Sequence, residues 1–187
     1  MRIISGEFRG RTIRTANAHH VRPATDRVRE TLFNMLANRI DFEDAAVLDL
    51  FAGSGSLGLE ALSRGARTAV FVETDREALR FIEQNIRTLG CTPRAEVIAM
   101  DALRYLEGIE REFRLVFADP PYGHAATPHI PGRVFERAVV SRGGYLLIEH
   151  EPEVSFPESP LYAPGPEKRF GRTRVTFFHH PHGAHRQ

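Results

Sequence analysis

An aspartate followed by two prolines and a tyrosine, Asp119-Pro120-Pro121-Tyr122, is the most specific chemical motif in this sequence. An exocyclic amine on a nucleic-acid base is a poor nucleophile because its lone pair is delocalised into the ring, and it carries two N–H donors. The Asp119 carboxylate and the Pro120 carbonyl, held by consecutive prolines, could accept from both donors and free the lone pair. Tyr122 offers a flat face on which the base can stack. We therefore predict a catalytic site for a planar amine, formed by Asp119, Pro120, Pro121 and Tyr122.

A glycine-rich segment, 49–58, is the second candidate site. Its spacing Gly53-x-Gly55-x-x-Gly58 lets the backbone approach a ligand and also satisfies the dinucleotide fingerprint. Asp49, four residues before the first glycine, would repel a pyrophosphate but suits an amino acid that carries a positive sulfonium. The Phe-Ala pair before the glycines is typical of methyltransferases. These features favour S-adenosylmethionine over NAD, with predicted contacts at Asp49, Phe51, Ala52, Gly53, Ser54 and Gly55.

Two more carboxylates follow expected strands and extend the predicted cofactor site. Glu73 stands twenty residues after Gly53, where it could accept both ribose hydroxyl hydrogens. Asp101 could accept from an adenine amine, and it could equally cap the next helix. The set includes the neighbours Thr74 and Ala102. Because positive sulfur already activates the methyl group, we expect no metal.

Alternating apolar runs and amphipathic helices must position these residues. Strands are expected at 46–51, 68–73, 95–100, 113–118, 143–149 and 173–178. Helices are expected after Asp26, between Asp75 and Gly90, and at 56–64, 101–107 and 133–140, with a loop at 120–132. This pattern predicts a Rossmann-like α/β fold: a mostly parallel sheet covered on both faces, with an antiparallel edge and a ligand at the carboxyl ends of its central strands. Short strands at 2–5 and 11–15 predict an N-terminal β-hairpin.

Basic residues gather at both ends of the chain. Residues 1–40 hold eight arginines and three acids, and residues 166–187 hold five basic residues and one acid. The middle, 41–165, holds twelve arginines and twenty acids. This segregation favours an anionic partner held by the two ends. The candidate RNA-binding residues are Arg9, Arg11, Arg14, Arg22, Arg27, Lys168, Arg169 and Arg172.

The charge pattern also suggests a division of the chain. We expect an RNA-contacting extension at 1–40, a catalytic domain at 41–180 and a disordered tail at 181–187. No signal peptide and no membrane-spanning apolar run is visible, and the single cysteine, Cys91, is typical of a reducing compartment. We therefore expect a cytoplasmic protein, acting as a monomer without membrane or metal.

The combined motifs resemble the bacterial RsmD family of class I S-adenosylmethionine-dependent methyltransferases. The resemblance rests on Gly6, Arg9-Gly10-Arg11 and the run Arg22-Pro23-x-Thr25-Asp26-Arg27-Val28-Arg29-Glu30, beside the glycine-rich segment and the Asp119 motif. It extends to Glu73, Asn85 and Lys168-Arg169-Phe170-Gly171. The resemblance implies a seven-stranded sheet, an N-terminal hairpin that helps to hold RNA, and methylation of the N2 amine of a guanine in small-subunit ribosomal RNA.

Other functions remain open on the residues alone. A DNA adenine-N6 or cytosine-N4 methyltransferase uses the same acidic-Pro-Pro-aromatic logic, although no separate target-recognition domain is visible. A protein glutamine methyltransferase usually has asparagine where Asp119 stands. An NAD-linked oxidoreductase fits the glycine spacing but leaves the Asp119 motif unexplained. A non-catalytic RNA-binding module would need neither Asp49, Glu73 nor Asp119.

Overall fold

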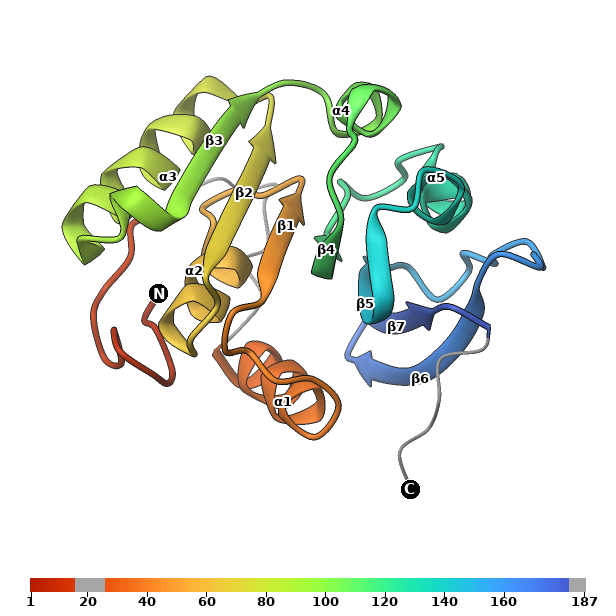
Figure 1. The fold of residues 1–187 in the computed structure, drawn as a ribbon, viewed down its shortest axis with the longest axis horizontal. Helices are drawn as coiled ribbons and strands as arrows, with labels where there is room; N and C mark the ends of the chain where they lie inside the picture. Colours follow the sequence, from red (N-terminus) through yellow and green to blue (C-terminus); the bar gives the residue numbers. More distant parts are fainter. Residues whose placement is uncertain (16–25, 182–187) are drawn as a thin grey trace.

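A seven-stranded sheet organises the residues that the computed structural model describes, which are 1–15 and 26–181 (Figure 1). Its strand order is β3-β2-β1-β4-β5-β7-β6. The strands are β1 (Ala46–Leu50), β2 (Thr68–Glu73), β3 (Ala95–Ala99), β4 (Phe113–Ala118), β5 (Val140–His150), β6 (Ala163–Phe170) and β7 (Thr173–His179). β1 to β5 pair in parallel, while β7 runs antiparallel to both β5 and β6. The predicted fold class and its antiparallel edge are confirmed, and the strand order reverses between β1 and β4, where such sheets bind ligands.

Helices cover both faces of this sheet. They are α1 (Asp26–Ala37), α2 (Ser56–Ser63), α3 (Arg76–Leu89), α4 (Ala102–Gly108) and α5 (Ile130–Glu136), with single 3-10 turns at Thr92–Arg94 and Thr127–His129. Phe71 and Phe117 point to the face where α1, α2, α3 and the N-terminal segment pack. Leu48, Val116 and Ile148 point to the opposite face, against α4 and α5. Within the described parts of the chain, no helix is both long and apolar enough to cross a lipid bilayer.

The N-terminal hairpin is present but shorter than expected. An antiparallel bridge joins Arg2 to Thr12, and the backbone N–H groups of Ile3 and Ile13 donate to the carbonyls of Arg11 and Met1, each at 3.0 Å. The backbone N–H groups of residues 4 and 5 donate instead to the Glu60 carboxylate in α2, and that of Phe8 donates to the Ser63 hydroxyl. Side chains of α2 therefore take the place of strand partners at residues 4, 5 and 8.

Two elements near the end of the chain also differ from expectation. The helix expected at 133–140 spans Ile130–Glu136, because β5 already begins at Val140. β6 was not predicted, since Pro164 and Pro166 interrupt its sequence. Prolines are tolerated there because β6 lies at the edge of the sheet, and its pairing with β7 shifts register between Pro164 and Glu167. The predicted RNA-binding residue Arg22, and the tail from residue 182, lie outside the described residues.

Candidate active site at the carboxyl edge of the sheet

Four carboxylates meet at the carboxyl edge, where β1, β2, β4 and β5 end. Asp49 pairs in register with Phe117 of β4, and Asp119 follows two residues later. Side chains alternate along a strand, so both acids share the face that Phe117 occupies. Glu73 at the end of β2 and Glu149 near the end of β5 fall on the same face by their registers. The predicted Asp49, Glu73 and Asp119 therefore come together, joined by Glu149, which was not predicted.

These acids lie close to one another in a poorly solvated environment. Asp49 is 2% exposed. Its pKa is raised to about 8, mainly by burial and also by the charge of Glu73. The hydrogen bond from the Gly58 N–H lowers the pKa and offsets part of this rise. Loss of solvation, and then the charges of Glu149 and Asp49, raise the pKa of Asp119 well above its usual range. Burial likewise raises the pKa of Glu149, although the Thr173 hydroxyl donates to that carboxylate.

Positive side chains do not balance this cluster. Across 1–15 and 26–181, none of the ion pairs involves Asp49, Asp119 or Glu149. Buried carboxylates without a counter-charge are unfavourable unless a bound cation completes the site. The site is therefore suited to a ligand that carries positive charge.

A tight turn between β1 and α2 presents backbone to this cluster. Phe51 adopts a φ of 58°, which is uncommon for a residue with a Cβ, and Gly53 adopts a φ of 55°. The Gly53 N–H donates to Glu73 over 2.8 Å, and the Gly58 N–H donates to Asp49 over 2.9 Å. Gly58 serves close packing, because a Cβ there would lie 2.4 Å from the ring of Phe71. Gly53 thus shapes the turn, whereas Gly58 lets α2 pack close to the sheet.

The two acids predicted to contact the nucleoside have structural roles as well. Glu73 also accepts from the backbone N–H groups of Thr74 and Asp75, at 2.7 and 2.9 Å. Asp101 caps α4 by accepting from the N–H groups of residues 103 and 104. The capping interpretation of Asp101 is thus confirmed, while the adenine contact remains a prediction, as does the role of its neighbour Ala102.

The Asp119 motif leads into a loop that contacts the turn between β1 and α2. Tyr122 is 61% exposed, and its hydroxyl donates to the Arg172 carbonyl at 3.2 Å. The ring of His124 meets the ring of Phe51 edge-on, with centroids 5.3 Å apart. The sequence around His124 favours an exposed loop residue, but the structure has it half-buried against the turn. An exposed aromatic face therefore stands at the mouth of the carboxylate cluster.

The predicted RNA-binding residues divide between the two edges of the sheet. Lys168 and Arg169 lie near the end of β6, and Arg172 lies in the β6–β7 turn, where its carbonyl accepts from Tyr122. Arg9 belongs to a turn at the amino edge, because its neighbour Glu7 pairs at 2.7 Å with Arg94, just before β3.

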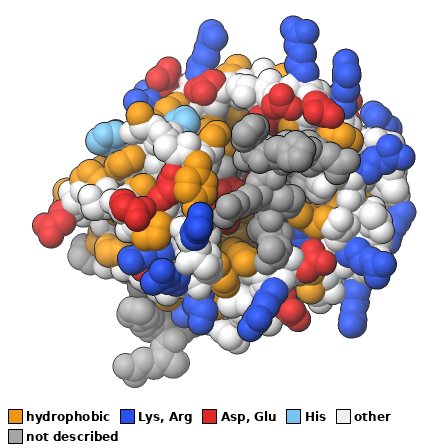
Figure 2. Space-filling view, turned by 180° about the vertical axis from the view of Figure 1, so that it is seen from behind, with side chains coloured by type: hydrophobic (Ala, Val, Ile, Leu, Met, Phe, Trp, Pro, Cys, Tyr) orange, Lys and Arg blue, Asp and Glu red, His pale blue; other side chains and the backbone are white. Residues whose placement is uncertain are grey.

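The remaining described residues of the predicted RNA-binding set are Arg11, Arg14 and Arg27, which lie in the N-terminal segment and in α1. The Arg11 guanidinium donates to the last carbonyls of α3, those of residues 88 and 89. The Arg14 backbone N–H donates to Asn85 of α3 while its side chain is exposed, and Arg27 is exposed in the first turn of α1. Figure 2 shows Lys and Arg side chains gathered along the side where α3 lies, at the right of that view. This gathering of basic side chains on one side of the molecule was not predicted.

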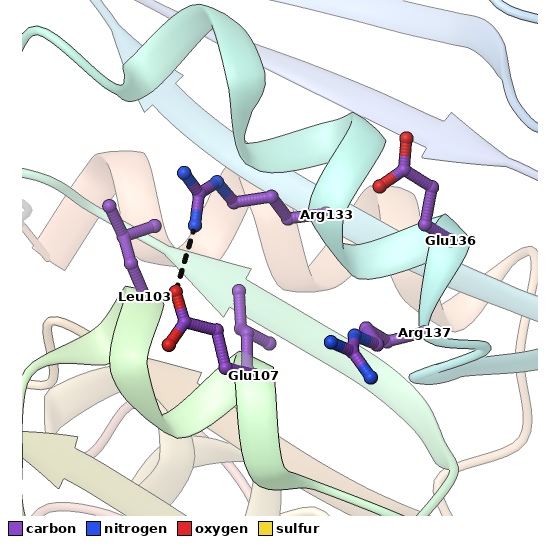
Figure 3. Close-up of a pocket in the computed structure, with 6 residues that line it drawn as sticks. Leu103, Glu107, Arg133, Glu136 and Arg137 are labelled. Atoms are coloured by element: carbon purple, nitrogen blue, oxygen red, sulfur yellow. Dashed lines mark ion pairs between the residues drawn. The ribbon is translucent and has the colours of Figure 1, made fainter.

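A groove of about 320 Å³ lies between α4 and α5 (Figure 3). Its side chains carry mixed charge, and Arg133 of α5 pairs with Glu107 of α4 over 3.5 Å. None of its lining residues is a predicted site residue. The carboxyl edge, and not this groove, is therefore the candidate active site.

Several known proteins are similar to this chain in sequence and in fold. A family model described as "Conserved hypothetical protein 95" matches residues 1–179. "Putative rRNA methyltransferase YlbH" of Bacillus subtilis is 39% identical over 162 residues, 85% of this chain and 87% of that protein. "Ribosomal RNA small subunit methyltransferase D" of Escherichia coli is 38% identical over 160 residues, 86% of this chain and 79% of that protein. The solved structure "Putative methyltransferase yhhF from Escherichia coli" is 34% identical with a TM-score of 0.84, covering 96% of this chain and 97% of that one.

Proposed function

This chain belongs to the family described as conserved hypothetical protein 95, the RsmD family, and on that premise we propose that it methylates the N2 amine of a guanine in small-subunit ribosomal RNA. It is an S-adenosylmethionine-dependent methyltransferase. The proposal of a base amine as the methyl acceptor is supported by one observation. A poorly solvated acid, Asp119, and an exposed aromatic residue, Tyr122, lie close together in sequence at the carboxyl edge. A planar amine-bearing base fits that combination.

The residues around the glycine turn fit the cofactor. S-adenosylmethionine supplies an electrophilic methyl group on a positively charged sulfur. Asp49 and its neighbouring acids provide the negative environment that a sulfonium and an amino group favour, because no side-chain cation neutralises them within the described residues. The turn at Gly53 leaves open space where a Cβ would stand, so backbone can approach the ligand.

Catalysis by the chain's own residues would be positioning and electrostatics. The Asp119 carboxylate accepts one N–H of the base amine, and the Pro120 carbonyl accepts the other. This arrangement draws the nitrogen out of conjugation with the ring and directs its lone pair to the methyl carbon. Tyr122 stacks on the base, and the hydrogen bond from its hydroxyl to Arg172 fixes the ring. The negative pair of Asp119 and Glu149 favours uptake of the proton that the amine releases.

We also propose the setting in which this reaction occurs. The substrate is RNA within a small-subunit particle, and the protein acts as a cytoplasmic monomer. Residues 1–40 form an RNA-contacting extension to the catalytic domain at 41–180. Reaching a base amine in folded RNA requires a loop or a flipped base, which accords with the exposed position of Tyr122.

Mapping the labelled nucleotide tests the proposal directly. The protein is incubated with methyl-labelled S-adenosylmethionine and unmodified small-subunit RNA, either free or reconstituted into particles, with duplex DNA offered in parallel. We expect label on the N2 amine of one guanine, with more incorporation in particles than in free RNA. Label on adenine, on cytosine or on the DNA would instead support the base-methylating alternatives that use the same motif.

Arg169 and Arg172 should contribute to RNA affinity by binding phosphates beside Tyr122. Replacing both by glutamine should weaken RNA binding and reduce the slope of log K against log salt by about 0.7–0.9 for each phosphate that is no longer neutralised. The Tyr122 hydrogen bond should persist, since its acceptor is the backbone carbonyl of Arg172. Filter binding over a series of salt concentrations gives both quantities.

Arg67→Gln is the matched control, because Arg67 is an exposed arginine that precedes β2 at the amino edge. This variant should bind RNA as the wild type does. Arg9→Gln tests the turn at the amino edge separately. An unchanged salt slope in the double variant would contradict the placement of RNA beside the β6–β7 turn.

A further inference from the structure

Asn85 joins the N-terminal segment to the turn that is predicted to hold the cofactor. The Asn85 side chain of α3 is 2% exposed. Its Oδ1 accepts from the Arg14 backbone N–H at 2.7 Å, and its Nδ2 donates to the Arg14 carbonyl at 2.8 Å. The same Nδ2 donates to the Ser54 carbonyl at 3.1 Å. Both N–H donors of the amide are thus used, one on each segment.

On the cofactor side, this bond fixes one peptide group of the turn. The carbonyl of Ser54 and the N–H of Gly55 belong to the same planar peptide. Asn85 holds that carbonyl, while the Gly55 N–H donates to the Ala52 carbonyl at 2.7 Å. The peptide is therefore restrained at both ends, and its orientation sets how the turn faces a ligand.

On the N-terminal side, Asn85 offers Arg14 the donor and acceptor that a neighbouring β-strand would offer. Further back along the chain, the Arg11 guanidinium makes a second set of hydrogen bonds to α3, on the carbonyls that end this helix. The Arg14 side chain remains exposed while its backbone is held. The position of this arginine therefore depends on the same amide that positions the turn.

We propose that Asn85 is a positioning residue that couples the cofactor turn to the N-terminal segment. A ligand seated on the Gly53–Gly55 turn holds the Ser54 peptide, and through Asn85 it restrains Arg14. Coupling of two binding events is reciprocal, so RNA held at Arg14 tightens cofactor binding by the same factor. The RNA half of this inference rests on the proposed function, whereas the cofactor half stands on the hydrogen bonds of Asn85.

Hydrogen exchange at the Arg14 amide tests the cofactor half without RNA. In the wild type, S-adenosylhomocysteine should slow exchange at this amide about 5–10-fold, the effect of strengthening one buried hydrogen bond. Asn85→Ala should abolish that slowing and weaken S-adenosylhomocysteine binding about 10-fold. Asn85→Asp keeps an acceptor for the Arg14 N–H but loses both donors, so it should weaken ligand binding and lose the ligand-dependent slowing.

Asn38→Ala is the control, because Asn38 lies just after α1 and its amide donates only to the nearby Asn34 carbonyl of that helix among the bonds of the described residues. It should show the wild-type response. A wild-type Arg14 amide whose exchange ignores the ligand would overturn the inference even if Asn85→Ala does not fold. In the RNA arm, RNA should tighten S-adenosylhomocysteine binding in the wild type and not in the Asn85 variants. If the ligand slows exchange at the Arg14 amide but the protein methylates no RNA, the coupling through Asn85 stands and the proposed function is overturned.

Discussion

Asp119→Ala is expected to lower turnover by about 10²–10³, the usual effect of removing one preorganised polar group from an active site. The variant loses the acceptor for one N–H of the base amine, while the Pro120 carbonyl remains. Cofactor affinity should change little, because Asp49 and the glycine turn stay intact. Single-turnover methylation with saturating RNA and S-adenosylmethionine measures the chemical step, and calorimetry with S-adenosylhomocysteine measures binding.

Two companion variants separate this effect from damage to the strand. Asp119→Asn keeps an acceptor oxygen on a side chain of equal size, so its loss should be smaller than that of Asp119→Ala. Glu112→Ala removes an exposed acid just before β4, at the opposite end of the same strand, and should behave as the wild type does. Turnover close to wild type in Asp119→Ala would contradict the assignment of Asp119 as the amine acceptor.

Asp49→Asn is expected to weaken cofactor binding by about 10²-fold, since it removes a charge-assisted interaction from a desolvated site. The same substitution should stabilise the protein without ligand near pH 8. It removes a buried carboxylate that lacks a counter-ion within the described residues, and the amide oxygen can still accept from the Gly58 N–H. Loss of binding together with a gain in stability would distinguish a ligand-binding acid from a structural one.

The pH dependence of stability follows from the raised pKa of Asp49. Its pKa is about 8 in the folded protein, and the unfolded value is about 4. The folded state therefore binds more protons between these values, and its stability falls as pH rises through that window. Urea unfolding without ligand should show the wild type losing stability from about pH 5 to pH 8, and Asp49→Asn losing less. The stability of the variant should still fall somewhat with pH, because the pKa values of Asp119 and Glu149 are also raised. A slope equal to that of the wild type would show that Asp49 is ionised in the free protein.

The predicted acids came together because of a general property of parallel sheets. Asp49, Glu73 and Asp119 each lie at or near the end of an apolar run, and the carboxyl ends of parallel strands share one edge. Glu149 occupies the equivalent place in β5 but belongs to no motif, and its proximity to Asp119 depends on the register between β4 and β5. A glutamate near the end of a further apolar strand was the signal available for it.

The N-terminal segment shows where local patterns stop being informative. Its alternating residues predict a hairpin, and the ends of that hairpin do pair, but the backbone donors of residues 4, 5 and 8 bond to Glu60 and Ser63, about 55 residues away in sequence. The positions of Arg9 and Arg11 at the amino edge follow from those distant contacts. β6 was not predicted for a different reason. Its prolines argue against a strand, but an edge strand tolerates prolines that an interior strand would not.

The anchoring of this segment has a consequence for how the protein matures. A peptide chain emerges from the ribosome N-terminus first, so residues 1–15 leave the exit tunnel well before their partners on α2 and α3. The ion pair from Glu7 to Arg94 spans 87 positions, and the bonds of Arg14 to Asn85 span 71. This segment therefore cannot dock fully until α3 and Arg94 have emerged, and until then the apolar side chains of Ile3, Phe8 and Ile13 remain accessible to chaperones.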